Sequence, residues 1–584
     1  MRICGDRAEV GLGGRRIKSL CLLETNEYEN GRENDMKKHD IVEGVIDTYE
    51  FPNKGSFHMD DRKVTVKGAI KGQKVSCRIT KLKNGKADGR LLEVLEKSEL
   101  EDAQPVCSHF GMCGGCSYQT LSYENQLKVK EELVKGLLDG VIDSAEHPYE
   151  WQGILASPVT KGYRNKMEFS FGDEYKDGPL ALGLHKKNST YDIVQMDDCY
   201  IVNDDLNKIV KYTVEFCRAA GLPYYKKMQH TGLLRHLVIR RSATNGDLLV
   251  NLVTSTQNLD ALDLDAFVRG LLDLPLEGKI AGILHTENDS MADAVISDRT
   301  NLLYGTEYIY ETVLGLQFKI SPFSFFQTNT KSAERLYDKA RSYVGDTKDA
   351  VIFDLYSGTG TIAQLLAPVA KKVIGVEIVE EAVEAARVNA ELNGLDNCEF
   401  IAGDVLKVID EIEEKPDFIV LDPPRDGINP KALTKIINYG VNELVYISCK
   451  PTSLARDLVT LQENGYYVTK ACAVDQFPGT VHVETVVKLS LKKDTPKIEV
   501  TMEPDEESNY TPEEKATYSK IKEYVKDKYG VNVHTSYIAQ VKRMCGLDMG
   551  ENYNKSKKEN PEVKQCPQEK VEYIKDALRY FKLI

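Results

Sequence analysis

The 584-residue sequence lacks any run of about eighteen or more apolar residues, the length that a membrane-spanning helix needs. Its N-terminal stretch contains only a brief apolar patch, SLCLL, which is too short for the core of a signal peptide. These two absences argue against a membrane protein and against a secreted one. We therefore expect a cytoplasmic protein without a membrane partner.

The sequence also lacks an excess of positive charge. Its 76 Lys and Arg stand against 90 Asp and Glu, which gives a net charge of −14. Such a balance normally argues against a nucleic-acid partner, but phosphate binding depends on local clusters. The segment from Lys63 to Arg90 is basic, whereas the acidic residues concentrate in the C-terminal half. The net charge therefore does not exclude RNA.

A cytoplasmic chain has no disulfide framework, so its 13 cysteines indicate metal ligands, a nucleophile or buried thiols. Three of them form the pattern Cys107-x5-Cys113-x2-Cys116, and Cys199 is the natural fourth member. Four thiolates suit tetrahedral zinc or an iron–sulfur cluster, and spacing alone does not decide between these. The triplet differs from the C-x3-C-x2-C of radical enzymes. Other cysteines, such as Cys77, Cys217, Cys398 and Cys545, are expected to be packing residues.

Two hydrophobic patterns divide the chain. From Ile41 to about Lys97, apolar and polar residues alternate between turns, which predicts four or five short antiparallel strands in a small β-barrel. From about Asp349, apolar strands alternate with amphipathic helices, which predicts a doubly wound α/β domain with a mostly parallel sheet.

We expect a disordered or mis-annotated extension at 1–35, the barrel at 36–98, a central α+β region at 99–330, the α/β domain at 331–492, a linker at 493–508 and a helical module at 509–584. Met36 is the alternative start. The helical module opens with a capping box made by Thr511, Pro512 and Glu514.

The strand VIFDLYS leads into a turn that contains Gly358 and Gly360 and opens a helix. These glycines allow the backbone to approach a ligand closely, and the helix N-terminus favours negative charge. The next strand ends in Glu377, at the right distance to bind ribose hydroxyls, and later strands end in Asp404 and Asp422. This layout resembles the class I S-adenosylmethionine-dependent methyltransferases. A dehydrogenase would carry G-x-G-x-x-G, from which SGTGTIA departs.

The residues after the last two strands indicate which atom is methylated. Arg425 follows Asp-Pro-Pro, where enzymes that methylate amino groups carry an aromatic residue. Cys449 lies at the carboxyl end of a strand, and Glu484 lies in a Pro-Gly loop before another strand. A thiolate that attacks carbon 6 of uracil makes carbon 5 nucleophilic, and a base must then remove the proton from carbon 5. We therefore predict that Cys449 is the nucleophile and Glu484 the base.

From Met36 to Lys492 the sequence resembles the RNA (uracil-5-)-methyltransferases of the bacterial 23S ribosomal RNA type. The motifs that carry this resemblance are SPFSFFQTN, DLYSGTGTIA, VLDPPRDG, SCKPTSLARDL and FPGTVHVETV. The resemblance implies that Gln327, Tyr356, Glu377 and Asp404 contact the cofactor and that Asp422 lies beside the cofactor and the target uracil. Thr361 stands where some relatives have an amide.

The same resemblance has further implications. It makes residues 36–98 a TRAM-like RNA-binding barrel, places a [4Fe-4S] cluster on the cysteine quartet, and puts arginines and aromatics of 163–171 and 234–242 near RNA. Because polar methyl transfer needs no electron, we expect the cluster to have a structural or RNA-positioning role.

The favoured hypothesis is methylation of a flipped-out uridine of 23S ribosomal RNA, without an obligate protein partner. One alternative is the same chemistry on transfer RNA, although the transfer-RNA relatives considered usually lack the quartet and the barrel. Another is a non-catalytic RNA-binding or assembly protein, against which the intact Cys449 and Glu484 argue. A redox sensor built on the cluster is the third. The tail from about Asn509 lies outside the family pattern and is either a partner module or a packing domain.

Overall fold

The computed structural model describes residues 36–59, 61–291, 298–345, 347–492, 518–529, 531, 533, 535–545 and 566–581. The chain divides into two units, Met1–Pro496 and Lys497–Ile584. The predictions for residues 1–35, for the linker at 493–508 and for the capping box at Thr511 lie outside the described residues.

The first unit begins with a six-stranded sheet in the order β1-β5-β6-β4-β3-β2. Its strands are β1 (Ile41–Val45), β2 (Thr48–Glu50), β3 (Lys54–Met59), β4 (Arg62–Lys67), β5 (Lys74–Lys83) and β6 (Lys86–Glu96). Val64 and Val66 alternate with polar residues along β4 and are fully buried, as expected for a sheet with one covered face. Four or five antiparallel strands were predicted here; the structure has six, and one pair, β4 with β6, is parallel. Their parallel direction follows from the intervening strand β5, which runs the opposite way.

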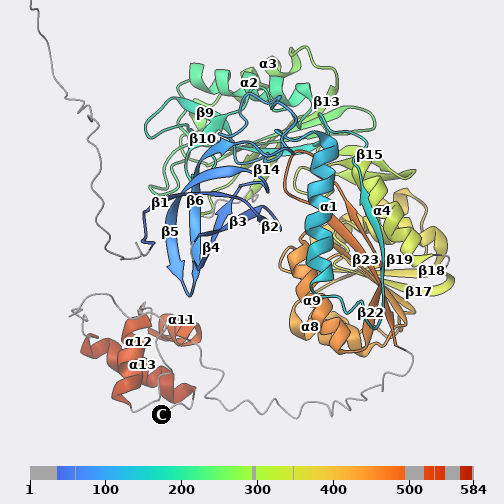
Figure 1. Ribbon diagram of the computed structural model, residues 1–584. Helices are drawn as coiled ribbons and strands as arrows, with labels where there is room; N and C mark the ends of the chain where they lie inside the picture. The colour runs from blue at the N-terminus through green and yellow to red at the C-terminus, as the bar shows by residue number, and fades with distance from the viewer. Residues whose placement is uncertain are drawn as a thin grey trace, which may run out of the picture. The chain divides into compact units, whose positions relative to one another are not determined.

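A long helix, α1 (Tyr123–Asp139), follows this sheet. Ser122 caps it by accepting a hydrogen bond from the backbone N–H of Asn125. The helix packs against β2, against strand β7 (Glu150–Leu155) and against helix α9 (Pro451–Glu463). It therefore connects the N-terminal sheet with an α/β layer that is formed much later in the chain (Figure 1).

The central region contains a seven-stranded sheet in the order β10-β9-β8-β11-β12-β13-β14. The strands are β8 (Lys166–Asp173), β9 (Leu180–His185), β10 (Ile193–Gln195), β11 (Leu234–Arg241), β12 (Asp247–Thr254), β13 (Lys279–Glu287) and β14 (Arg299–Gly305). Helices α2 (Asp204–Ala219) and α3 (Leu264–Leu272) share one hydrophobic core with this sheet. A hairpin of β15 (Ile309–Val313) and β16 (Leu316–Ile320) then leads to helix α4 (Thr330–Val344).

The α/β layer is an eight-stranded sheet in the order β19-β18-β17-β20-β21-β23-β22-β7. Its later strands are β17 (Thr347–Leu355), β18 (Ala370–Glu377), β19 (Cys398–Ala402), β20 (Phe418–Leu421), β21 (Glu443–Ser448), β22 (Tyr466–Val474) and β23 (Glu484–Leu491). The first five in spatial order are parallel, and β23 runs antiparallel to its neighbours. The predicted α/β architecture is confirmed. The edge strand β7 was missed by the sequence analysis.

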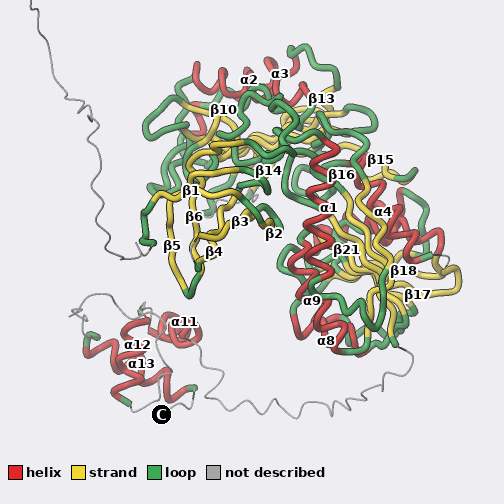
Figure 2. Tube along the Cα trace, viewed as in Figure 1, coloured by secondary structure: helices red, strands yellow, loops and turns green. Residues whose placement is uncertain are grey.

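Helices cover both faces of this sheet (Figures 1 and 2). They are α4, α5 (Thr361–Leu366) and α6 (Glu380–Leu392) on one face, and α1, α7 (Val405–Val408), α8 (Pro430–Asn438) and α9 on the other. Ile352 and Phe353 are adjacent in β17 and enter the two different cores, because strand side chains alternate. The strand order reverses between β17 and β20, and α/β sheets bind ligands at the carboxyl ends of the strands that flank such a point.

The second unit contains three described helices, α11 (Tyr518–Tyr529), α12 (Thr535–Met544) and α13 (Gln568–Tyr580). They share a core that includes Ile521, Val541 and Ile574. Over the described ranges of both units, no helix is long and apolar enough to cross a membrane.

Candidate active site

A cleft of about 1790 Å³ opens at the carboxyl ends of β17, β18, β20 and β21. This volume exceeds the roughly 300–1,000 Å³ of typical small-molecule pockets, so the cleft has room for a cofactor and a nucleotide together. The predicted residues that lie on its wall are Gln327, Tyr356, Gly358, Thr361, Glu377, Asp404, Asp422, Cys449 and Glu484. Sequence positions more than 150 residues apart thus meet at one place.

The loop after β17 is hydrogen-bonded to the carboxylate of Glu377. One oxygen of Glu377 accepts a hydrogen bond from the N–H of Gly358, and the other accepts one from the N–H of Val379, each at 3.0 Å. A carboxylate oxygen has two lone pairs, so both oxygens can still bind a ligand hydroxyl. The structure therefore fixes the orientation of Glu377 without using up its capacity to accept hydrogen bonds.

Of the two glycines predicted to bind the cofactor, Gly358 lies on the cleft wall and Gly360 does not. The φ of Gly360 is 73°, and a Cβ there would lie 2.6 Å from the ring of Phe400 and 2.8 Å from Ala386. Glycine is required at this position because helix α6 and strand β19 pack directly on the loop. The loop continues into α5, which begins at Thr361.

The loop is also anchored by Asp354, a buried residue of β17 that the sequence analysis did not single out. Asp354 accepts a hydrogen bond from the N–H of Ala363 at 2.9 Å. Burial and the nearby Asp422 raise the pKa of Asp354 to about 8. The visible signal was an acidic residue inside the otherwise apolar strand VIFDL.

Tyr356 and Asp404 complete this part of the wall. Tyr356 adopts a left-handed backbone conformation with φ of 69°, and burial raises its pKa to about 12, which keeps the phenol neutral. Asp404 caps α7 by accepting a hydrogen bond from the N–H of Leu406 at 3.0 Å. Such caps hold a carboxylate in one orientation.

Cys449 directly follows strand β21, and Glu484 is the first residue of β23, the antiparallel neighbour of β21. The pairing of the two strands ends at Ser448 and Thr485, the residues next to Cys449 and Glu484. Burial raises the pKa of Glu484 to about 8, with Asp422 adding to the rise and Arg425 opposing it. Burial raises the pKa of Cys449 to about 11, again with contributions from Glu484 and Asp422 and opposition from Arg425. The thiol, the carboxyl groups and the guanidinium thus act on one another.

Helix α9 holds the loop that carries Asp422 and Arg425. Ser453 donates a hydrogen bond to the carbonyl of Arg425 at 2.7 Å, and Asp457 accepts one from the N–H of Ile428 at 2.9 Å. Asp457 also accepts one from the hydroxyl of Tyr446 at 2.7 Å. The SLARD motif therefore orients the Asp-Pro-Pro-Arg loop from the helix that follows Cys449.

The segment before α4 places Gln327 beside Gln476, in the segment that leads to Glu484. Gln476 donates hydrogen bonds to the side chain of Gln327 at 3.4 Å and to the carbonyl of Asn329 at 3.0 Å. The exposed Phe325 also lies on the cleft wall. Further wall residues that the sequence analysis did not assign are Phe477, Thr480 and His482, all in the segment that leads to Glu484.

The segments expected near RNA divide into two kinds of position. Arg164 lines the cleft. Arg235 and Arg240 are buried instead. Arg235 donates to the carbonyl of Asn288 at 2.7 Å, and Arg240 donates to the carbonyls of Pro322 and Ser324. These two arginines hold the backbone, so the basic pattern LRHLVIRRS overstated the number of charges available to RNA.

The four predicted cysteine ligands, Cys107, Cys113, Cys116 and Cys199, line one small pocket. The N–H of Gly115 donates to the sulfur of Cys113 at 3.3 Å. Over the described residues, no three or more His, Cys, Asp or Glu side chains form a group that could hold a metal ion. The quartet is thus brought together in space, but not in the geometry of a single-ion site.

Comparison with known proteins identifies the family of this chain. Residues 295–492 match the family model described as tRNA (uracil-5-)-methyltransferase. An uncharacterized RNA methyltransferase of Caldanaerobacter subterraneus is 48% identical over 77% of this chain and 99% of its own length. One from Clostridium acetobutylicum is 48% identical over 78% of this chain and 99% of its own length.

A solved structure supports the same assignment. The tRNA (uracil-54, C5)-methyltransferase of Pyrococcus abyssi, in complex with S-adenosyl-L-homocysteine, matches 77% of this chain and 100% of its own length. The sequence identity is 27% and the TM-score is 0.60. Together with the relatives, the match shows that the chain belongs to the RNA (uracil-5-)-methyltransferase family.

Proposed function

We propose that this protein methylates carbon 5 of a uridine in RNA, with S-adenosylmethionine as the methyl donor and 23S ribosomal RNA as the substrate. The observation that carries this proposal is that Cys449 and Glu484, at adjoining ends of the paired strands β21 and β23, line one cleft together with Glu377. A thiol and a buried carboxyl that face one ligand site suit addition to carbon 6 and proton removal from carbon 5.

The reaction follows from these two groups. The Cys449 sulfur forms a bond to carbon 6, and the electrons of the carbon 5–carbon 6 double bond make carbon 5 a nucleophile. S-adenosylmethionine would supply the methyl group to carbon 5 through its sulfonium and leave as S-adenosylhomocysteine. Glu484 as carboxylate then takes the proton of carbon 5, the double bond forms again, and the sulfur leaves as thiolate. The high pKa of Glu484, about 8, makes its carboxylate a stronger base than an exposed one.

The charge of the cleft fits a cationic donor. Asp422 and Glu484, both on the cleft wall, have raised pKa values, because burial disfavours their charged forms and because Asp422 adds to the rise at Glu484. A sulfonium placed among them would favour their ionised forms. We assign Gln327, Tyr356, Glu377 and Asp404 to binding the donor. Glu377 would bind the ribose hydroxyls, and the backbone of the turn at Gly358 would lie against the donor.

Two RNA substrates need to be compared. The family motifs of the sequence support ribosomal RNA, which is our first candidate. Transfer RNA is the second, favoured by the solved Pyrococcus abyssi enzyme and by the description of the family model. Because that transfer-RNA enzyme matches this chain over 100% of its length, the N-terminal sheet and central region do not separate the two substrates.

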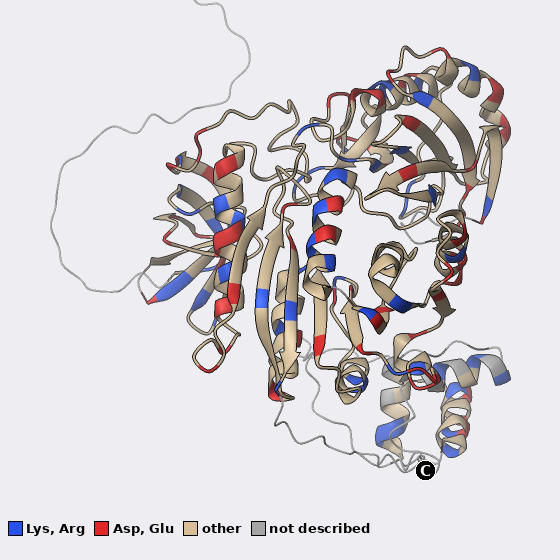
Figure 3. Cartoon of the chain, turned by 90° about the vertical axis from the view of Figure 1, so that its right-hand side faces the viewer, with Lys and Arg blue, Asp and Glu red and all other residues tan. Residues whose placement is uncertain are grey.

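The acidic net charge is compatible with either RNA. Lys and Arg are interspersed with Asp and Glu along the described elements in the view of Figure 3. The cleft itself carries the cationic residues Arg164, Lys319 and Arg425 on its wall. Local cations of this kind are what phosphate binding needs.

We further propose that Cys107, Cys113, Cys116 and Cys199 hold a [4Fe-4S] cluster. Their shared pocket supports this assignment. Each thiolate of such a cluster binds a different iron, so the four sulfurs stand farther apart than the ligands of a single ion. The cluster would stabilise the cysteine loop beside the cleft. Iron and sulfide content, with Cys199→Ser as the deficient variant, tests the assignment.

The proposed reaction is tested with ribosomal RNA and transfer RNA that carry tritium at uracil carbon 5. Release of tritium into water from ribosomal RNA alone supports the full proposal. Release from transfer RNA alone keeps the reaction and replaces the substrate. No release from either RNA, with donor bound and a folded protein, contradicts the proposed reaction.

A further inference from the structure

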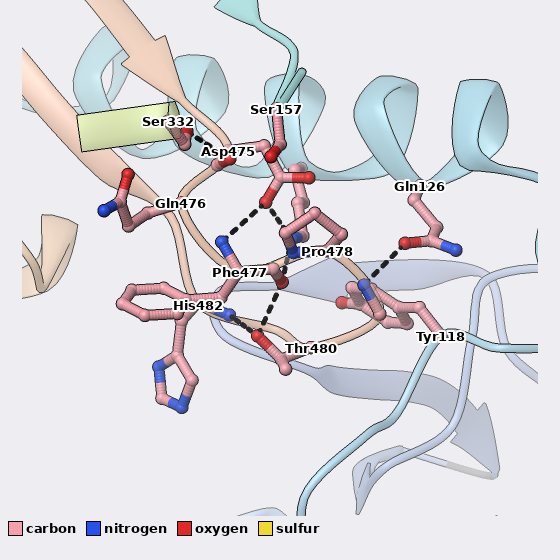
Figure 4. Close-up of polar contacts among 12 residues, drawn as sticks. Tyr118, Gln126, Ser157, Ser332, Asp475, Gln476, Phe477, Pro478, Thr480 and His482 are labelled. Carbon is pink, nitrogen blue, oxygen red and sulfur yellow. Dashed lines mark hydrogen bonds and ion pairs between the residues drawn. The ribbon is translucent and has the colours of Figure 1, made fainter. Parts of the chain in front are cut away.

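The segment between β22 and β23 carries the proposed base at its end. It begins with Asp475 directly after β22 and reaches Glu484, the first residue of β23. Figure 4 shows its backbone with Asp475, Phe477, Thr480 and His482, and the hydrogen bonds that hold it. Phe477, Thr480 and His482 line the cleft, so a displacement of this segment changes both the cleft wall and the place of Glu484.

Lys130 of helix α1 reaches the start of this segment. Its Nζ lies 2.6 Å from Oδ1 of Asp475 and donates a second hydrogen bond to the carbonyl of Phe477 at 3.0 Å. The exposed fractions of the two side chains are 1% and 0%. An ion pair between residues 345 positions apart is therefore enclosed completely within the protein.

Other contacts hold the rest of the segment. The N–H of Gly479 donates to Gln126 of α1 at 2.8 Å, and its carbonyl accepts from the N–H groups of Ser117 and Tyr118. From the opposite side, Ser332 of α4 donates to the carbonyl of Asp475 at 2.8 Å. Helix α1 contributes the two long side chains, and it does so one turn apart, since positions 126 and 130 lie on the same helix face.

The hydrogen bonds continue toward the base. The carbonyl of Phe477, which Lys130 binds, also accepts a hydrogen bond from the hydroxyl of Thr480 at 2.9 Å. The same hydroxyl oxygen accepts one from the N–H of His482 at 3.2 Å. Lys130 is thus connected through three consecutive contacts to a residue two positions before Glu484.

Stability alone does not account for such a pair. Removing two charges from water costs about as much as their attraction returns, and well-packed apolar residues often serve a buried position equally well. A buried lysine that binds a carboxylate and a carbonyl at once does something that apolar residues cannot, because it holds one side chain and one backbone carbonyl of the same loop by directional contacts.

We propose that Lys130 is a positioning residue for the proton-removal step. It acts through Asp475 and the carbonyl of Phe477 to hold the segment so that Glu484 reaches the proton on carbon 5. This inference rests on the proposed function of Cys449 and Glu484. The nucleophile and the donor-binding loop come from β21, β17 and β18, whereas the hydrogen bonds of Lys130 go to the segment that leads to the base, so its replacement should slow proton removal more than the earlier steps.

The proposal predicts which species accumulates. When Lys130 is replaced, Cys449 still adds to carbon 6 and carbon 5 still accepts the methyl group, but the proton on carbon 5 is removed slowly. The bond between the sulfur and carbon 6 then breaks slowly as well. Methylated RNA consequently remains covalently attached to the protein.

The experiment compares Lys130→Met with the charge-free pair Lys130→Met/Asp475→Leu. The single variant leaves a buried carboxylate without its partner and is expected to destabilise the fold, whereas the double variant removes both charges. Lys135→Met, on the exposed side of the same helix in an ion pair with Asp139, is the control. For each variant, tritium release, label transferred from the methyl donor into denaturation-resistant complex, and thermal unfolding are measured.

A displacement of catalytic groups by about 1 Å costs on the order of 100-fold, and we expect tritium release to slow by about that factor in the double variant while covalent methylated complex accumulates. Lys135→Met should match wild type. Wild-type release rates in the folded double variant, or slowed release without accumulated complex, would overturn the proposal. If wild type itself released no tritium, the proposed function would have failed rather than the role of Lys130.

Discussion

Cys449 directly follows β21, and Glu484 is the first residue of β23, the antiparallel neighbour of β21. The pairing of the two strands ends at Ser448 and Thr485, which precede Cys449 and follow Glu484 in the sequence. The sheet therefore brings the proposed nucleophile and the proposed base, more than thirty residues apart, to the same edge.

Replacing Glu484 with Gln should separate the steps of the reaction. Gln keeps the size of the side chain but cannot take a proton, and a general base typically contributes about 10²- to 10⁴-fold. We expect tritium release to fall by that range while covalent methylated complex accumulates. A Glu484→Gln enzyme that turns over like wild type would assign the base to another group.

The rate should rise with pH. The pKa of Glu484 is raised to about 8 and that of Cys449 to about 11, and both groups act in their deprotonated forms. A raised pKa leaves the protonated, inactive form dominant at neutral pH, so kcat/KM should increase from about pH 7 to pH 9.

Asp422→Asn tests the cause of this pH dependence. Asp422 raises the pKa values of both groups, so its neutralisation should move the acidic limb of the profile to lower pH. The exposed Asp426 of the same loop provides the matched change, Asp426→Asn. Equal profiles for the Asp422 variant and wild type, at saturating donor, would show that this electrostatic coupling is absent.

Gly360→Ala should damage the donor site through packing. A Cβ at Gly360 would meet Phe400 and Ala386 closely, whereas at Gly394, which has φ of 63°, it would meet nothing within 4 Å. Overpacking costs about 1–3 kcal/mol in addition to the backbone strain of a left-handed residue. We expect Gly360→Ala to unfold at lower temperature than Gly394→Ala and to bind donor more weakly. Calorimetric titration and thermal unfolding measure both effects.

Deleting residues 506–584 should leave methyl transfer to protein-free RNA largely intact. The described helices of the second unit have a hydrophobic core of their own, and the described residues that line the cleft all belong to the first unit. The measurement is the tritium-release rate of the shortened chain relative to the full chain. Loss of all activity in a folded, donor-binding shortened chain would place part of the site in the tail.

The site residues at strand ends were predictable from the sequence because each follows a recognisable apolar strand. Glu377 ends β18, Asp422 and Cys449 directly follow β20 and β21, and Asp404 lies two positions after β19. Parallel strands bring their carboxyl ends to one edge. The order of the motifs along the chain was therefore enough to predict that these side chains would share a cleft.

Contacts between distant segments were not predictable in this way. The edge strand β7 pairs with β22 across more than 300 residues, and its sequence EWQGIL has no strong alternation. Lys130 reads as one more lysine of an amphipathic helix until the fold brings Asp475 to it. The basic residues of β11 likewise suggested an RNA surface, although Arg240 is enclosed by the loop whose carbonyls it binds.

The central claim is that Cys449 forms a covalent bond to carbon 6 of the target uracil. RNA that carries 5-fluorouridine at the target tests it directly. Carbon 5 of this base carries fluorine in place of the proton that must be removed before the sulfur can leave, so the adduct persists. Mass spectrometry of digested complexes should find the nucleotide on the peptide that contains Cys449, together with a transferred methyl group, and none in Cys449→Ala. An adduct on another cysteine, or normal methylation by Cys449→Ala, would contradict the account.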